Sequence, residues 1–75
     1  MDVLDCRGEV CPLPVIKARE FFIRNPRLPV TVLVTQPNQC ENVASLADRF
    51  NRDASKEERP GHFAVIFGPE KPKPD

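Results

Sequence analysis

The run Val30-Thr31-Val32-Leu33-Val34-Thr35 constrains the fold most, because it is β-branched almost throughout. β-Branched side chains favour strands, and apolar residues that do not alternate with polar ones indicate a strand covered on at least part of both faces. Gln36-Pro37 ends the run, since proline cannot continue a paired strand. The run therefore predicts a well-covered strand near the middle of the chain.

Helical patterns lie on both sides of this strand. The first extends from Pro12 to about Arg24 and ends at Asn25-Pro26, since the residue before proline avoids the helical region. Asn38 and Glu41 have the spacing of a capping box and predict the start of a second helix, which continues to about Asn51. The apolar residues at helical spacing are Val15, Ala18 and Phe22 in the first helix, and Cys40, Val43, Ala44, Ala47 and Phe50 in the second.

The outer segments supply the remaining strands. Val3 to Cys6 reads as a first strand ended by Arg7-Gly8, and His62 to Phe67 as the last. The stretch from Arg52 to Pro60 is dominated by charge, so at best it holds a short edge strand. The Pro- and Lys-rich residues 69–75 cannot bury apolar surface and are expected to be disordered.

This order of elements predicts an α/β (α+β) two-layer sandwich with the order βαβαββ. We expect a mixed four-stranded sheet, its third strand weak or absent, with two helices on one face. The first two strands should be parallel, and right-handed crossovers then place both helix N-termini near one edge of the sheet. Residues 1–68 form the predicted domain, and we expect a monomer.

Composition excludes several function classes. The 75 residues carry 11 basic and 11 acidic side chains without a basic stripe, so nucleic-acid binding is not expected. No apolar run approaches the roughly 18 residues of a membrane span, and Asp2 stands where a signal peptide carries positive charge, which predicts a cytoplasmic protein. Three cysteines and one histidine without a Cys-x-x-Cys pair do not indicate a disulfide framework, a metal site or a bound cofactor.

The motif Cys11-Pro12-Leu13-Pro14 contains the candidate reactive residue, Cys11. Proline is tolerated in the first turn of a helix, where the backbone N–H groups have no intrahelical partner. The sequence thus predicts that Cys11 is the N-cap, where unpaired amides and the helix dipole stabilise a thiolate. Such a thiol has a pKa below its free value of about 8.5 and is nucleophilic near neutral pH.

The segment from Leu4 to Val15, which reads LDCRGEVCPLPV, resembles the signature of the TusA/SirA/YedF family of sulfur-carrier proteins. The hallmark of that family is Cys-Pro-x-Pro, preceded by Asp-x-Arg-Gly, which matches Asp5, Arg7 and Gly8. Asn38 and the following Glu41-Asn42-Val43 are similar to the start of the second helix in YedF-like members. The resemblance covers about residues 2–68, and Glu9 stands where many members have Leu.

This resemblance implies that Cys11 accepts sulfane sulfur as a persulfide from a donor protein, such as a cysteine desulfurase or a rhodanese-like protein, and relays it to an acceptor protein. The chain would be a sulfurtransferase component rather than a free-standing enzyme. The pathways it suggests are tRNA thiolation, molybdenum-cofactor synthesis, sulfur oxidation and selenium metabolism.

Other residues receive supporting roles. Asp5 and Arg7 are expected to pair and brace the loop before Cys11, Gly8 to supply a positive φ, and Pro12 and Pro14 to fix the helix start. Val10 and Leu13 would form an apolar rim on which a partner docks.

Two rival functions remain open at this stage. A thiol redox sensor or reductase would pair Cys11 with Cys40 or Cys6 in a disulfide, although both of those cysteines are more simply core residues. A non-enzymatic regulatory or RNA-binding module is the second rival, which the absence of Trp and Tyr disfavours.

Overall fold

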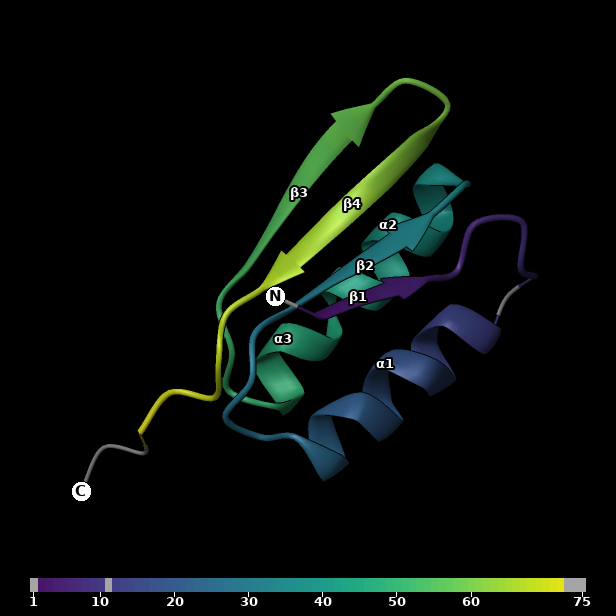
Figure 1. Cartoon of the computed structure of the whole chain (residues 1–75). Coiled ribbons are helices and arrows are strands. Elements are labelled where there is room, and N and C mark those ends of the chain that lie inside the picture. Colours follow the sequence, from purple (N-terminus) through teal and green to yellow (C-terminus); the bar gives the residue numbers. More distant parts are fainter. Residues whose placement is uncertain (1, 11, 73–75) are drawn as a thin grey trace.

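The computed structural model describes residues 2–10 and 12–72. Its elements are β1 (Asp2–Asp5), α1 (Leu13–Arg24), β2 (Val30–Val34), α2 (Pro37–Ala44), α3 (Leu46–Arg49), β3 (Ala54–Arg59) and β4 (His62–Phe67). The strands form a four-stranded sheet in the order β1-β2-β4-β3. The helices lie on one face of this sheet (Figure 1), which confirms the predicted two-layer sandwich.

The parallel pairing of β1 with β2 fixes the position of the loop between β1 and α1. Asp2 pairs with Val30 and Asp5 with Leu33, so both strands point the same way. The segments that follow them, which lead into α1 and α2, therefore meet at one edge of the sheet, as the right-handed crossover rule predicts. Antiparallel pairing of β4 with β2 and of β3 with β4 completes the mixed sheet.

The core lies between the sheet and the helices. Alternate residues of the two central strands face the helices, because side chains of a strand point to opposite faces in turn. Phe22 of α1 packs edge-on against Phe67 with ring centroids 4.8 Å apart, and also against Phe50 at 5.1 Å. The buried apolar residues are Cys6, Ala18, Phe22, Val30, Val32, Val34, Cys40, Val43, Leu46, Val65 and Phe67.

The charged stretch after Arg52 forms a longer strand than the sequence suggested. β3 is six residues long and pairs with β4 along its whole length. Pro60 and Gly61, with φ +79° at the glycine, close the hairpin as a type II turn requires at its two central positions. The charged side chains of β3 suit its place at the edge of the sheet, where they discourage pairing with other chains.

The second helical segment differs from the expectation at its start and in its middle. It begins at Pro37, and the Gln36 N–H donates to Gln39 Oε1 at 3.2 Å, so the cap involves these glutamines and not Asn38 with Glu41. Proline fits the first helical position, so the helix starts earlier in the chain than a cap at Asn38 would allow. Ser45 then separates α2 from α3, and its hydroxyl donates to the Asn42 carbonyl oxygen at 2.6 Å, a local bond that competes with helix continuation.

Candidate functional site

The sequence-predicted sulfur-carrying residue, Cys11, lies outside the described residues, so the site is built from the segments that flank it. Before it, the Val10 carbonyl oxygen accepts a hydrogen bond from the Leu13 N–H at 3.0 Å. After it, Pro12 is the N-cap of α1, and the helix begins at Leu13. The prediction that Cys11 itself is the N-cap is therefore wrong by one residue.

The start of α1 offers fewer free amide donors than the sequence argument assumed. Pro12 and Pro14 have no N–H, and the Leu13 N–H is already bonded to Val10. The field of the helix dipole remains, because α1 is 12 residues long. Any stabilisation of a Cys11 thiolate thus depends more on the dipole and on nearby charges than on a set of unpaired amides.

The loop before Cys11 is held against the segment that follows β2. Gly8 has φ +79°, which confirms its expected backbone role, and its N–H donates to Thr35 Oγ1 at 2.7 Å. The side-chain amide of Gln39 donates to the Glu9 carbonyl oxygen at 2.6 Å. Neither Thr35 nor Gln39 was expected from sequence, because the predicted parallel pairing of β1 with β2 brings the two segments together but does not tell which side chains meet.

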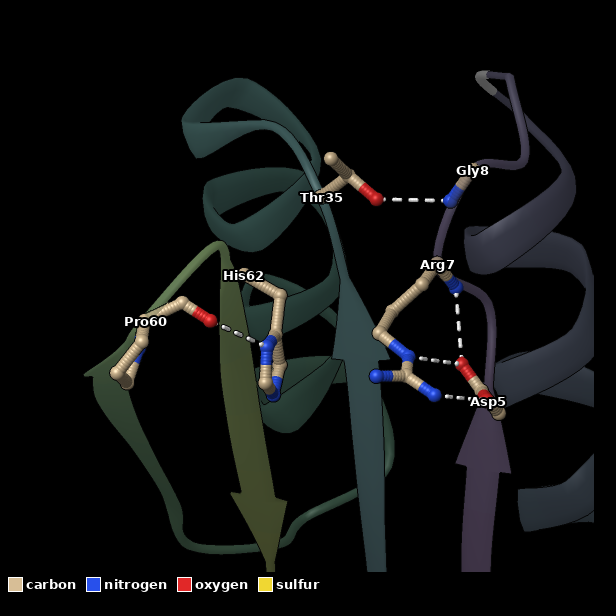
Figure 2. A network of polar contacts seen from close by, with 6 residues as sticks. All are labelled: Asp5, Arg7, Gly8, Thr35, Pro60 and His62. Carbon is tan, nitrogen blue, oxygen red and sulfur yellow. Dashed lines mark hydrogen bonds and ion pairs between the residues drawn. The ribbon is translucent and has the colours of Figure 1, made fainter.

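Asp5 and Arg7 form the expected pair. Arg7 Nε and Nη2 donate to the two carboxylate oxygens of Asp5 at 2.8 Å each, and the Arg7 N–H donates to Asp5 Oδ1 at 3.2 Å. These hydrogen bonds lower the pKa of Asp5 to about 2. Figure 2 shows the Arg7 guanidinium turned back to Asp5 at the end of β1, while the hydrogen bond of Gly8 with Thr35 lies above it.

An ion pair that the sequence analysis missed joins the same loop to α1. Lys17 Nζ donates to Glu9 Oε2, with the Glu9 side chain 26% exposed and that of Lys17 46% exposed. The two residues are eight positions apart, and one of them lies outside any regular element, so no periodicity pointed to the contact.

The two described cysteines are poor nucleophiles. Cys6 is 1% exposed, and burial, followed by the neighbouring Glu9 carboxylate, raises the pKa of its thiol to about 11. Cys40 is 4% exposed, and burial raises the pKa of its thiol as well. Cys40 lines a cleft between α2 and the β3–β4 hairpin, together with Lys56 and Phe63.

The surface around the loop combines an apolar rim with a neighbouring cleft. Val10 is 71% exposed and Leu13 42% exposed, as expected for a docking rim, and Ile16 continues this exposed apolar surface along α1. A cleft of about 300 Å³ lies between the loop before Cys11 and the start of α2. The residues that line it are Gly8, Glu9, Val10, Thr35, Gln36, Asn38 and Gln39.

The described residues contain no group of three or more His, Cys, Asp and Glu side chains placed to hold a metal ion. Within the same residues, none of the helices has the length and apolar character needed to cross a membrane.

Comparisons with known proteins agree with this architecture. Residues 2–67 match the family model described as Sulfurtransferase TusA. The crystal structure of the SirA-like protein from Desulfitobacterium hafniense is 30% identical, with a TM-score of 0.81 over 93% of this chain and 100% of that chain. No curated protein matches the sequence. Because the family model covers nearly the whole chain, this protein belongs to the TusA sulfurtransferase family.

Proposed function

We propose that this protein is a cytoplasmic sulfur carrier that holds sulfane sulfur as a persulfide on Cys11 and passes it from a donor protein to an acceptor protein. Membership of the TusA family supports sulfur transfer. The observation that carries the choice of residue is the burial of the other two thiols, Cys6 and Cys40, whose pKa values are raised. Cys11, by contrast, stands between the exposed Val10 and Pro12.

The transfer requires no net oxidation. The Cys11 thiolate attacks the terminal sulfur of a donor persulfide, a new S–S bond forms at Cys11, and the donor S–S bond breaks. The donor leaves as a thiolate, and the proton of its terminal sulfur stays with the transferred sulfur. A cysteine desulfurase or a rhodanese-like protein supplies such a persulfide. The second step repeats the first, with the carrier as the donor.

The exposed apolar rim of Val10 and Leu13 supports docking of these partner proteins. Both side chains lie within two residues of Cys11, so a partner that covers them also covers the transferring sulfur. Exclusion of water there would protect the persulfide during transfer, since a closed site limits side reactions.

The rival functions gain less support. A redox sensor needs a second reactive thiol, and the raised pKa values of Cys6 and Cys40 leave little thiolate on either at neutral pH. An RNA-binding sheet needs stacking aromatics. Phe63 and Phe67 of β4 pack with the helix-side core, so the partly exposed side chains on the other face of that strand are His62 and Ile66.

The direct test is sulfur loading of the full chain by a cysteine desulfurase with cysteine. We expect a mass gain of about 32 Da, the mass of one sulfur atom. Cys11→Ser should abolish the gain, while Cys6→Ser and Cys40→Ser serve as matched controls and should retain it. Loading that survives in Cys11→Ser would overturn the assignment.

A further inference from the structure

Glu9 is tied to three parts of the fold at once. Its N–H donates to the Cys6 carbonyl oxygen at 3.2 Å, and its own carbonyl oxygen accepts from the Gln39 side chain at 2.6 Å. Its carboxylate pairs through Oε2 with Lys17 of α1. The end of β1, the start of α2 and the second turn of α1 therefore converge on this residue.

The other carboxylate oxygen of Glu9 has no satisfactory partner. Oε1 is buried and makes no hydrogen bond of standard geometry, although the carboxylate interacts with the Cys6 thiol. Burying a charged oxygen without a hydrogen bond opposes folding. An apolar side chain at this position would leave no oxygen unpaired, but it could not pair with Lys17.

Both members of the Glu9–Lys17 pair are charged at neutral pH. The hydrogen bond with Lys17 lowers the pKa of Glu9, and the hydrogen bond with Glu9 raises the pKa of Lys17. Covalent geometry limits the Cα atoms of Glu9 and Cys11 to about 7 Å apart, because they are two residues apart in the chain. Glu9 therefore brings a negative charge into the segment directly before the proposed sulfur-carrying residue, and Lys17 brings the compensating positive charge.

The ionisable groups at the end of β1 are already balanced or uncharged. From β1 come Asp5, which is paired with Arg7, and Cys6, whose thiol has a pKa of about 11 and is neutral at pH 7. His62 of β4 faces Asp5. The cleft beside the loop receives only carboxamides from the start of α2, namely Gln36, Asn38 and Gln39.

We propose that Glu9 and Lys17 are positioning residues that hold the loop against α1 and, through their balanced charges, set how readily the Cys11 thiol ionises. The inference rests on the proposed role of Cys11 as the sulfur carrier. Because the Coulomb interaction acts in opposite directions for the two partners, each has a distinct effect. Loss of Glu9 favours the thiolate, and loss of Lys17 disfavours it.

The test is the pH dependence of the alkylation rate of Cys11, followed by peptide mapping in the full chain. Glu9→Gln should lower the pKa of Cys11, and Lys17→Met, which keeps an unbranched stem, should raise it. For charges near the protein surface, we expect two shifts of opposite sign, each on the order of half a unit. The double variant should return close to the wild-type value, and Lys17→Arg, which keeps the charge, should leave it unchanged.

A matched control removes the same charge elsewhere. Asp53→Asn breaks the ion pair with Lys71, which has an N–O distance of 3.2 Å. Asp53 directly precedes β3 at Ala54, and Ala54 pairs with Phe67, which pairs with Val30 at the opposite end of the sheet from the loop. This variant should leave the pKa of Cys11 unchanged.

Shifts of Cys11 in the same direction in both single variants, or no shift in either, would overturn the inference, because a purely structural pair loses the same contact in both. Sulfur loading separates this result from failure of the proposed function. Wild-type protein that gains no sulfur while the two opposite shifts persist would contradict the carrier role and leave the charge effect standing. Normal loading without opposite shifts would contradict only the charge effect.

Discussion

Three thiols in one small chain differ through their surroundings and not through their chemistry. Cys6 directly follows β1 and is buried in the core, and Cys40 is buried at 4% exposure in α2. Removal of a thiol from water disfavours its thiolate, which is the nucleophilic form. The sequence predicted both core positions, that of Cys40 from the apolar face of its helix and that of Cys6 from the general tendency of free cysteines to be buried.

The burial of these two cysteines predicts the order of thiol reactivity. At pH 7, Cys11 should react with iodoacetamide faster than Cys6 or Cys40, whose pKa values are raised. Peptide mapping after brief treatment of the folded protein measures the three rates. Preferential labelling of Cys6 or Cys40 would show that the reactive thiol has been assigned to the wrong residue.

The Asp5–Arg7 pair predicts a defined acid dependence of stability. The pKa of Asp5 falls from 3.8 to about 2 on folding, chiefly through its hydrogen bonds with Arg7. A depressed folded-state pKa contributes stability above the unfolded-state value, and that contribution disappears as the pH falls from about 4 to about 2. Urea unfolding across this range should thus show wild type and Asp5→Asn converging at the acid end.

Arg7→Gln removes the other partner and is the matched variant for this experiment. It should converge with wild type over the same pH window. A stability difference between wild type and Asp5→Asn that remains constant down to pH 2 would show that the pair does not stabilise the fold through ionisation.

At the scale of elements, Arg52 joins segments that the sequence could not place together. It is 4% exposed, and its guanidinium stacks over the Phe22 ring with 4.3 Å to the centroid. Its Nη atoms donate to three carbonyl oxygens, those of Asn25 and Leu28 in the loop after α1 and of Gly68 after β4. From sequence, Arg52 belongs to the exposed charged stretch, because its partners are backbone atoms that leave no signature in composition.

Loss of these contacts of Arg52, here called the Arg52 clamp, should lower the free energy of unfolding. Arg52→Met removes the three hydrogen bonds to carbonyl oxygens, and we expect a loss of about 2–4 kcal/mol in the free energy of unfolding. Denaturant unfolding of the variant measures this loss directly. Arg49→Met, an exposed position on α3, is the control and should change the value by less than about 0.5 kcal/mol. Equal effects of the two substitutions would contradict the role of Arg52.

For the whole molecule, the sequence predicted the layers, the parallel pairing and the edge at which both helices begin. Each of these follows from local patterns joined by a chirality rule. The Glu9–Lys17 pair, the hydrogen bond of Gln39 with Glu9 and the Arg52 clamp could not be predicted. Each depends on side chains of different elements meeting in space, and a single sequence contains no distance information of that kind.

The C-terminal segment, expected to be disordered, makes contacts in its described part. The Glu70 N–H donates to the Pro26 carbonyl oxygen at 3.0 Å, and the Lys71 N–H donates to that of Asn51 at 2.8 Å. Asn51 Nδ2 donates in return to the Lys71 carbonyl oxygen at 2.9 Å. Residues 73–75 lie outside the described residues.

These contacts should add little net stability. Each exposed hydrogen bond contributes about 1 kcal/mol, and ordering each residue of the segment costs about as much. Removal of residues 70–75 should therefore change the free energy of unfolding by less than about 1 kcal/mol in a denaturant titration. A larger loss would show that the segment is an integral part of the fold.

The central claim is that Cys11 holds sulfur and does not form a disulfide, and the intact mass of wild-type protein tests it most directly. One sample is divided between a cysteine desulfurase with cysteine and mild peroxide. The account predicts a gain of about 32 Da at Cys11 in the first portion and no rapid loss of two hydrogens in the second. A wild-type protein that gains no sulfur during desulfurase turnover, but rapidly loses about 2 Da in peroxide through a disulfide from Cys11 to Cys40 or Cys6, would contradict it.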